Sequence, residues 1–349
     1  MASGSYTSLE IGSQPAVWQA TLDEVASRHE WFFDRLANLA RTPFVATGCG
    51  STYYLSLAAA ATLRGTGLAA VAAPASELVF FMRQSVPHDC TLLAISRSGT
   101  TTETLWAVER YQKERPHGKV IAITCAPETP LVERAEVCLI APRAQEQSIA
   151  QTRSFTSMAL LIQALAAFLT RDAARLERIR RLPSALAELF ERAGDLPRTI
   201  GADLGIQRFF FLGSGPLYGM ACEAMLKTKE MTCSWAEAYH TLELRHGPMA
   251  VVDADTLVVG MISDSAAEAE IKVLQHMKRL GARTLALAET AGAYDWSGVD
   301  RVIELRSGLD EWERGALYLP LIQWIAFHRS LAKGLDPDSP VNLTAVINL

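Results

Sequence analysis

Short apolar runs alternate with longer stretches of helical periodicity across the first half of the chain. The runs are apolar throughout instead of alternating with polar positions, which is typical of strands covered on both faces. Strands that alternate with helices favour parallel pairing in an α/β sandwich. The runs that predict strands are residues 44–47, 68–72, 92–96, 119–124 and 137–140.

The same pattern returns in the second half of the chain at a nearly constant offset. Gly48 and Gly213 each follow an apolar run and lie 165 positions apart, and Ser96 and Ser263 lie 167 positions apart. The apolar run at residues 283–287 is a third landmark, which matches the run at residues 120–124 at a similar offset. The sequence therefore predicts two tandem α/β/α sandwiches with parallel sheets, related by an internal duplication.

Helical segments flank and join the two predicted domains. A helical pattern begins at Gln14-Pro15, after a polar stretch at residues 1–14 that we interpret as a loose arm. Residues 151–168 predict a long helix, and charged helical segments with breaks at Pro183 and Pro197 follow it. We therefore expect an N-terminal arm and helix at 1–40, a first domain at 41–172, a helical connection at 173–200, a second domain at 201–335 and a C-terminal tail at 336–349.

Composition narrows the classes of function. The chain of 349 residues is 49% hydrophobic and 20% charged, and its formal net charge is −5. Its densest basic stretch, residues 175–181, is interrupted by apolar and acidic residues, which fits a solvated helix and argues against nucleic-acid binding. The longest apolar stretch, residues 158–169, contains Gln163 and is too short to cross a bilayer, so we expect no membrane partner.

The six cysteines and seven histidines indicate no metal centre. The sequence has no Cys-x-x-Cys pair and no His-Glu-x-x-His or related ligand spacing. Most cysteines lie in apolar patterns, so we interpret them as buried thiols of a protein in the reducing cytoplasm. The polar first residues lack the apolar core of a signal peptide, which favours the same location. We expect neither a metal nor a cofactor.

A cluster of hydroxyl side chains follows the third apolar run. The stretch from Ser96 to Thr101 contains two serines, two threonines and Gly99, and a helical pattern begins at Thr102. The first turn of a helix has unpaired backbone N–H groups and partial positive charge, so a phosphate group suits such a strand-to-helix loop. A helix cap alone would need only one hydroxyl. The stretch therefore predicts a phosphate-binding loop, to which Arg97 can add charge.

The second copy departs from the first in this loop. Asp264 stands where the first copy has Arg97, and Ala266-Ala267 replaces Gly99-Thr100. Because a carboxylate repels phosphate, we expect the anion to bind in the first copy only. The second copy must then contribute something else.

A charged row is the best candidate for that contribution. Glu223, Lys227 and Glu230 are spaced to share one face of an otherwise apolar helix. The alternative is a solvated stripe with ordinary ion pairs, which are common and weak. His246 follows, and the turn at Gly247-Pro248 can present its side chain.

Together these motifs resemble the sugar isomerase (SIS) family, and within it the isomerase half of glutamine–fructose-6-phosphate amidotransferases. The resemblance covers nearly the whole chain in order. It implies two SIS domains in a homodimer that binds a small sugar phosphate. The chain begins where that isomerase half begins, so we expect no glutaminase domain. The matching stretches are Glu10-Ile11, Gln14-Pro15, residues 48–52, 96–101, 223–230 and 237–248, and Asn342-Leu343.

The resemblance also implies a role for each matching residue. Glu230 is expected to move a proton between C1 and C2 of the sugar, with Glu223 and Lys227 lining the same site. His246 is expected to help open the sugar ring, and in the family this histidine reaches in from the partner subunit. The residues expected to hold the substrate phosphate are Gly50, Ser51, Thr52, Ser96, Arg97, Ser98 and Thr101. Three further residues are expected to line the substrate, namely Cys49, Ala150 and Gln151.

Three positions depart from the family pattern. Ala345 stands where a tail lysine forms an imine with the ketose, Arg97 replaces a glutamine, and Gln151 replaces a substrate-contacting serine. The tail can still cover the site, but we do not expect synthesis of an amino sugar from glutamine.

We expect isomerisation coupled to deamination of an amino-sugar 6-phosphate, such as glucosamine 6-phosphate giving fructose 6-phosphate and ammonia. The substrate amine can itself form the imine, so this reaction needs no lysine. The alternatives are a deglycase of phosphorylated sugar–amine adducts, a simple ketose/aldose isomerase and a non-catalytic sugar-phosphate sensor.

Overall fold

The computed structural model describes residues 3–36, 39–292 and 294–344, and the chain divides into two compact units. The upstream unit contains Ala16–Glu146 and Arg153–Arg181. The downstream unit contains Met1–Pro15, Gln147–Thr152 and Leu182–Leu343. Each unit holds one sheet, which corresponds to one copy of the repeat found in the sequence.

The upstream unit is built on a parallel five-stranded sheet in the order β2-β1-β3-β4-β5. Its strands are β1 (Phe44–Gly48), β2 (Ala70–Pro74), β3 (Thr91–Ile95), β4 (Val120–Thr124) and β5 (Val137–Ile140). The central strands β1, β3 and β4 are buried at every position, as their unbroken apolar runs predict. The helices are α2 (Gln14–Ser27), α3 (His29–Leu36), α4 (Ser51–Gly65), α5 (Ala75–Ser85), α6 (Thr102–Glu114), α7 (Pro130–Arg134), α8 (Arg153–Thr170) and α9 (Ala173–Ile179).

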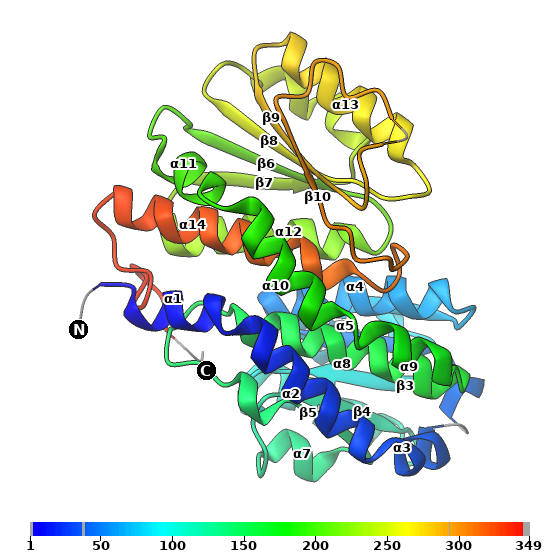
Figure 1. Cartoon of the computed structure of the whole chain (residues 1–349). Coiled ribbons are helices and arrows are strands. Elements are labelled where there is room, and N and C mark those ends of the chain that lie inside the picture. Colours follow the sequence, from blue (N-terminus) through cyan, green and yellow to red (C-terminus); the bar gives the residue numbers. More distant parts are fainter. Residues whose placement is uncertain (1–2, 37–38, 293, 345–349) are drawn as a thin grey trace. The chain divides into compact units, whose positions relative to one another are not determined.

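The downstream unit has a second parallel sheet, in the order β10-β9-β8-β6-β7. Figure 1 shows α13 along one face of this sheet and α12 against the other. Its strands are β6 (Arg208–Gly213), β7 (Trp235–Tyr239), β8 (Thr256–Met261), β9 (Arg283–Ala288) and β10 (Arg301–Glu304). Its helices are α1 (Ser5–Gly12), α10 (Leu182–Ala193), α11 (Leu196–Ala202), α12 (Leu217–Thr232), α13 (Ala267–Arg279) and α14 (Pro320–Ala332).

The two sheets have one topology. When β6 is matched to β1, the second sheet repeats the strand order of the first from edge to edge. The register repeats as well, because Phe44 pairs with the first residues of β2 and β3, and Arg208 pairs with the first residues of β7 and β8. The predicted α/β fold with two duplicated parallel sheets is confirmed.

The N-terminal stretch differs from the predicted loose arm. Residues 5–12 form α1, in which Thr7, Glu10 and Ile11 are buried. Asp338 accepts hydrogen bonds from the backbone N–H groups of Tyr6 and Thr7 at 3.1 and 2.7 Å, so it caps this helix from the far end of the sequence. The prediction was wrong because the partner of the arm is distant along the chain.

One other helical prediction needs correction, because the helical pattern that begins at Gln14 is divided at Arg28 into α2 and α3. The expected breaks at Pro183 and Pro197 do separate helices, since these prolines lie in the first turns of α10 and α11. A proline is well tolerated there because first-turn N–H groups lack intrahelical acceptors.

Helix α8 is longer than the apolar stretch that the sequence suggested. Its 18 residues, Arg153–Thr170, meet a length and hydropathy criterion for a membrane span. However, 89% of this segment is buried inside the structure, as in a core helix. Gln163 accepts a hydrogen bond at 2.7 Å from the guanidinium of Arg175 on α9, which satisfies a polar group within this core.

The six cysteines are all free thiols. Cys90, Cys125 and Cys222 are buried, as expected, and burial raises the pKa of all three thiols. Cys233 is exposed, contrary to the expectation of buried thiols, because it ends α12 in a left-handed conformation at φ 48°.

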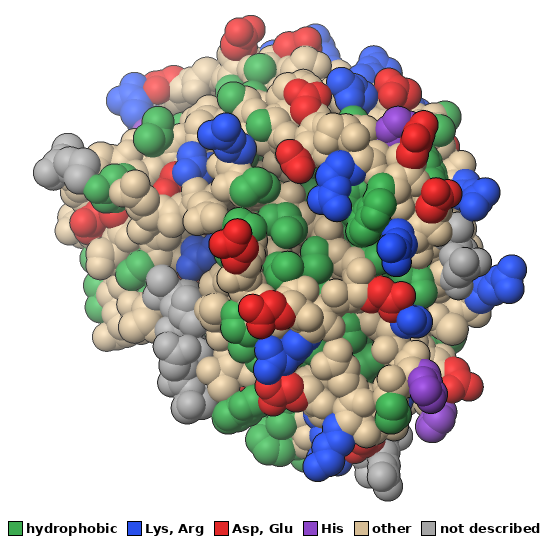
Figure 2. Space-filling model, turned by 90° about the horizontal axis from the view of Figure 1, so that it is seen from below, with side chains coloured by type: hydrophobic (Ala, Val, Ile, Leu, Met, Phe, Trp, Pro, Cys, Tyr) green, Lys and Arg blue, Asp and Glu red, His purple; other side chains and the backbone are tan. Residues whose placement is uncertain are grey.

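Charges of both signs are interspersed on the face of the molecule seen in Figure 2. Neither lysines and arginines nor aspartates and glutamates form a continuous field there. A face of this kind lacks the single-sign surface with which nucleic-acid-binding proteins attract a phosphate backbone.

Candidate active site

The predicted phosphate loop joins β3 to α6 in the upstream unit. Ser96 is 1% exposed, and its hydroxyl lies 3.2 Å from the Thr101 hydroxyl and accepts the N–H of Gly99 at 3.1 Å. Ser98 is half-buried, and its Oγ accepts the N–H and the hydroxyl of Thr100 at 3.2 and 3.0 Å. Ser96 therefore holds the loop together from inside, while Ser98 lies nearer the surface.

Gly99 is needed for both the conformation and the packing of this loop. Its φ of 67° is left-handed, a region that L side chains rarely adopt. A Cβ at this position would lie 2.1 Å from Thr129 Oγ1, closer than any real contact. The glycine thus lets the loop pass directly over Thr129.

The second glycine loop of the upstream unit joins β1 to α4. Thr52 closes it, because its hydroxyl accepts the Cys49 N–H and donates to the Cys49 carbonyl, both at 2.9 Å. Ser51 and Thr52 are nearly buried, at 5% and 4% exposure. Gly50 has φ 54°, and a Cβ there would have no neighbour within 4 Å, so the space above the glycine is open to a ligand.

Both of these loops end at a helix N-terminus that can bind an anion. The N-cap residues Gly50 of α4 and Thr101 of α6 make no side-chain cap hydrogen bond. Because β1 and β3 are adjacent and parallel, their carboxyl ends and the two loops lie at the same edge of the sheet. Uncapped helix N-termini with hydroxyls around them suit a phosphate group.

Two side chains at these loops have partners that the sequence did not reveal. The guanidinium of Arg97 lies 3.7 Å from Glu146, whose side chain is fully buried and also accepts a hydrogen bond from Ser154. Part of the charge that Arg97 offers to a phosphate is thus compensated within the protein. The Cys49 thiol lies 3.5 Å from the Thr104 hydroxyl, and burial raises its pKa, so it remains a neutral thiol.

The equivalent loop of the second copy is filled by a carboxylate of its own chain. Glu311 is 4% exposed and accepts the N–H groups of Asp264 and Ser265 at 2.6 and 3.0 Å, together with the Ser265 hydroxyl. A second buried carboxylate, Glu270, accepts the N–H and hydroxyl of Ser263 at 2.7 and 3.0 Å. The loop therefore does bind an anion, but this anion is a carboxylate of the same chain, Glu311.

This geometry corrects the role that the sequence suggested for Asp264. Its carboxylate is bound by the buried guanidinium of Arg314 through two hydrogen bonds of 2.7 and 2.5 Å. Its charge is thus compensated, and Glu311 occupies the place where an external anion would bind. Nothing local in the sequence pairs Glu311 with a loop 46 positions earlier.

The charged row of the downstream unit lies on α12 and is not a solvated stripe. Glu223 and Lys227 are 0% and 1% exposed, and the Glu230 side chain is 18% exposed. The Lys227 ammonium lies 3.4 Å from Glu223 and is hydrogen-bonded to Glu230. A buried ammonium between two carboxylates fixes the orientation of Glu230, whose side chain keeps contact with solvent.

Strand β7 brings a further polar pair next to this helix. The Tyr239 hydroxyl and the Trp235 indole N–H donate to the two oxygens of Glu237. Burial and the Glu237 carboxylate raise the pKa of Tyr239 to about 12, so the phenol stays protonated and keeps donating. The sequence marked this stretch as a family motif but did not predict the pair.

The segment after β7 carries the candidate His246 and a second histidine, His240. The His240 ring stacks on Tyr218 with centroids 3.7 Å apart, and burial lowers the pKa of His240. His246 is exposed at the end of a short 3-10 turn, Glu243–Arg245, where its N–H donates to the Glu243 carbonyl at 3.0 Å. Within the described chain, His246 is therefore accessible to an external partner.

The two substrate-lining residues expected at 150 and 151 lie in the downstream unit. Ala150 is 2% exposed and packs in an apolar cluster with Ile11 and Phe327. The Gln151 side-chain oxygen is buried and has no hydrogen-bond partner among the described residues.

The tail position that distinguishes this chain, Ala345, lies outside the described residues. The last lysine of the sequence, Lys333, is described and has a structural role. Its ammonium donates to the carbonyls of Thr232 and Cys233 at 2.6 and 3.2 Å, at the end of α12. A lysine fixed in this way supports a helix C-terminus.

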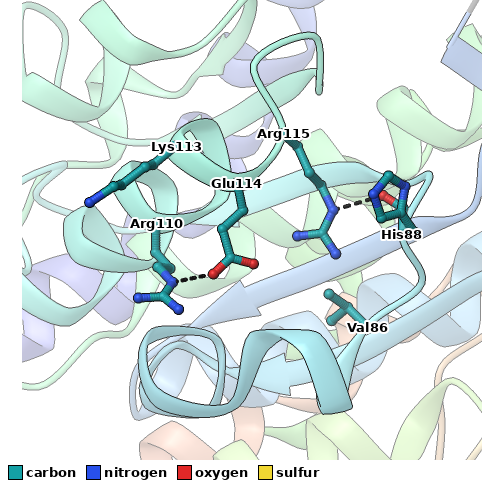
Figure 3. Close-up of a pocket in the computed structure, with 6 residues that line it drawn as sticks. All are labelled: Val86, His88, Arg110, Lys113, Glu114 and Arg115. Atoms are coloured by element: carbon teal, nitrogen blue, oxygen red, sulfur yellow. Dashed lines mark hydrogen bonds and ion pairs between the residues drawn. The ribbon is translucent and has the colours of Figure 1, made fainter.

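A surface pocket of about 720 Å³ lies elsewhere in the upstream unit (Figure 3). Its lining comes from the segment before β3 and the last turn of α6, whereas the phosphate loop lies between the other ends of these elements. Arg115 donates to the His88 and Pro87 carbonyls at 2.7 and 3.1 Å. Basic side chains complement the negative end of a helix dipole, which accounts for Lys113 and Arg115, while Arg110 pairs with Glu114 at 2.6 Å.

Comparison with known proteins reveals a match to one protein family. A family model for the SIS domain matches residues 44–168 and 206–294. A glutamine–fructose-6-phosphate aminotransferase of Pseudomonas syringae pv. tomato is 29% identical over 97% of this chain and 58% of that protein. The chain spans about half the length of the curated relatives it matches.

Two solved structures share the fold over nearly their full length. Tagatose-6-phosphate ketose/aldose isomerase from Escherichia coli superposes with a TM-score of 0.87 and 25% identity, covering 97% of this chain and 96% of that one. Glucosamine-6-phosphate deaminase from Thermotoga maritima superposes with a TM-score of 0.75 and 26% identity, covering 95% of this chain and 100% of that one.

Proposed function

The chain belongs to the SIS domain family, and on this premise we propose that it is a phosphosugar isomerase that deaminates an amino-sugar 6-phosphate. The reaction converts a 2-amino-aldose 6-phosphate, such as glucosamine 6-phosphate, and water to a ketose 6-phosphate and ammonia. The observation that supports it most is the buried row on α12, in which Lys227 orients the partly exposed carboxylate of Glu230.

The phosphate loop supplies binding energy remote from the reacting carbons. The uncapped starts of α4 and α6, with Ser51, Thr52, Ser98 and Thr101 around them, are suited to hold the 6-phosphate. Binding energy from a non-reacting group can be used to orient the reacting atoms.

Glu230 acts as the base of the proposed reaction. In the open-chain sugar it removes the C2 proton, and the electron pair forms a C1–C2 double bond while the C1=O π bond breaks and O1 takes a proton. A proton is then delivered to C1, the C1–C2 double bond is replaced by a C2=N double bond, and the nitrogen loses a proton. His246, as in the family it resembles, assists ring opening by proton transfer at the ring oxygen. The product of this shift is a C2 imine.

The imine forms from the amine that the substrate already carries. Water adds to C2, the C–N bond breaks, and ammonia leaves with the proton balance restored. The protein thus needs no amine of its own, in agreement with Ala345 at the tail position. We further propose that this enzyme acts in the cytoplasm as a homodimer.

A simple ketose/aldose isomerase is the second candidate. The observation that favours it is the TM-score of 0.87 to the Escherichia coli tagatose-6-phosphate isomerase. The same base and the same phosphate anchor serve both reactions, because both begin with proton transfer between C1 and C2.

The substrate is identified by a panel assayed with the purified protein. Ammonia release from glucosamine 6-phosphate or galactosamine 6-phosphate supports the deaminase and identifies the epimer. Amino-acid release from a fructosamine-type 6-phosphate supports a deglycase instead. Interconversion of tagatose 6-phosphate with its aldose, without ammonia release from any amine, supports the simple isomerase. Binding without any turnover indicates a sensor.

The role of Glu230 has its own test. Glu230→Gln keeps the shape of the side chain but removes the base, so kcat should fall by roughly a thousandfold. Affinity for the sugar phosphate, measured by calorimetry, should stay within about twofold of wild type, because the phosphate anchor is intact. Glu268→Gln, an exposed carboxylate on α13, is the matched control. A Glu230→Gln protein with wild-type turnover would exclude Glu230 as the base.

A further inference from the structure

The carboxylate of Glu10 holds a segment of chain more than 130 positions away. Glu10 lies on α1 and is 2% exposed. It accepts the N–H of Gln147 at 2.6 Å, the N–H of Ser148 at 3.3 Å and the hydroxyl of Ser148. Burial of a carboxylate is costly, so three donors at one anion indicate a built contact.

The segment that Glu10 holds is fixed along its whole length. Ile149 donates its N–H to the Asp338 carbonyl at 3.2 Å, and the Gln323 amide donates to the Thr152 carbonyl at 3.3 Å. The Ser148 hydroxyl lies 3.2 Å from the Ala150 carbonyl, so the residue bound by Glu10 also contacts the backbone next to Gln151.

Gln151 lies in this segment, between Ala150 and Thr152. Its side-chain oxygen is buried without a hydrogen-bond partner among the described residues. Leaving a buried acceptor unsatisfied costs free energy, so such atoms are rare unless a ligand or water completes them. A sugar hydroxyl or a substrate ammonium is a donor that meets this need.

We propose that Glu10 is a positioning residue for substrate binding, which acts by fixing the backbone from Gln147 to Gln151. This inference rests on the proposed function, since it assigns Gln151 to a donor group of the sugar. Glu10 does not itself touch the substrate. Its effect belongs to binding, because a contact made equally in the ground state and the transition state changes KM and leaves kcat.

A purely structural role for Glu10 is the alternative, and the chain offers a matched control for it. Glu311 is equally buried and accepts the same set of donors, namely two backbone N–H groups and one serine hydroxyl, in the same unit. Loss of either carboxylate should lower the melting temperature. Only loss of Glu10 should weaken substrate binding.

The test compares Glu10→Gln with Glu311→Gln, using glucosamine 6-phosphate as the probe. We expect the KM of Glu10→Gln to rise roughly tenfold with kcat within about threefold, since a small misplacement of a contact is costly. We expect Glu311→Gln to keep both constants within about twofold. Equal increases in KM for the two variants would assign Glu10 a structural role only.

A double-mutant cycle tests whether Glu10 acts through Gln151. In a Gln151→Ala background, Glu10→Gln should raise KM by less than about twofold, because the group that it positions is gone. A full tenfold increase in that background would overturn the proposed route. If Glu10→Gln does not fold, Ser148→Ala replaces it, because this change removes one of the three bonds and the contact with Ala150.

Failure of the proposed function can be told apart from failure of this inference. If the wild type binds glucosamine 6-phosphate without converting it, the deaminase proposal falls. The dissociation constants of the same variants, measured by calorimetry, then decide the role of Glu10 in place of KM. If no sugar phosphate binds to the wild type, both proposals fall.

Discussion

Single carboxylates decide which copy of the duplicated loop is available to a ligand. Ser98 and Ser265 occupy equivalent positions in the two loops, but Ser265 already donates to the buried Glu311. Ser98 is half-buried and bonded only within its own loop by the contacts described. At the scale of residues, the two loops therefore differ in where an anion would come from. Glu311 of the same chain fills the second loop, whereas the first loop is left open to an anion from solution.

Substitution of the two serines tests this difference. Ser98→Ala removes a hydroxyl from the open loop, and loss of one charge-assisted hydrogen bond should raise the KM for the sugar phosphate roughly tenfold. Ser265→Ala removes the equivalent hydroxyl from the filled loop and should leave KM within about twofold. Steady-state kinetics of both variants provide the measurement. A Ser98→Ala enzyme with unchanged KM would remove Ser98 from the phosphate site.

Gly99 gives a second test at the same scale. Gly99→Ala combines a left-handed φ of 67° with a contact of 2.1 Å to Thr129 Oγ1, and should destabilise the upstream unit by about 3 kcal/mol. Gly67→Ala has a similar φ of 86° but no neighbour within 4 Å, so it should cost about 1 kcal/mol. Denaturant unfolding measures both. Equal losses would mean that only the backbone conformation requires Gly99.

At the residue scale, the sequence predicted where hydroxyls gather but not where carboxylates bind. The loop at 96–101 follows β3 and precedes α6 as predicted, because all of its members are neighbours in sequence, while its role in phosphate binding stays a prediction. The partners Glu146 and Glu311 are 49 and 46 positions from the side chains they bind, Arg97 and Ser265. No local pattern indicates contacts at such a separation.

At the scale of elements, burial explains which strands of the second sheet the sequence revealed. The central strands are buried at every position, and their apolar runs predicted them closely. Strands β7 and β10 lie at the two edges of the second sheet and have mixed exposure, and the apolar pattern did not indicate them. An edge strand is covered less completely, so its sequence need not be apolar throughout.

The sequence also did not reveal helix α1, because the residue that caps it, Asp338, lies near the other end of the chain. Asp338→Ala removes the acceptor for the N–H groups of Tyr6 and Thr7, and loss of such a cap should destabilise the downstream unit by about 1–2 kcal/mol. Limited proteolysis should then cut within residues 5–12 sooner than in wild type.

The control for this change is an exposed aspartate. Asp195→Ala removes a carboxylate whose ion pair with Arg198 is 64% exposed on both sides, so stability should not change measurably. Equal sensitivity of both variants to protease would show that α1 does not depend on the Asp338 cap.

At the scale of the whole molecule, the duplication accounts for two sheets of one topology. The nearly constant offset between matching landmarks of the two copies indicated the repeat, and the matching strand orders confirm it. The offset could not indicate how the copies had diverged, because the divergence lies in side-chain partners.

Hydrogen exchange with and without glucosamine 6-phosphate tests this division of roles. Backbone amides at residues 96–104 should gain protection when the sugar phosphate binds, since the ligand occupies an uncapped helix start. Amides at residues 263–270 should not change, because Glu311 and Glu270 already occupy their loop. Protection of both loops would show that Glu311 yields its place to the ligand.

Because Glu311 belongs to the same chain, it fills the loop at 263–266 whatever the concentration of metabolites around the protein. A carboxylate that is part of the same chain has a fixed effective concentration at the loop, so the loop needs no dissolved anion to fill it. The loop at 263–266 therefore keeps its form in a starved cell and in a fed one alike. On the proposed function, only the loop at 96–101 responds to the concentration of the sugar phosphate, so one chain would combine a concentration-dependent loop with an invariant copy of it.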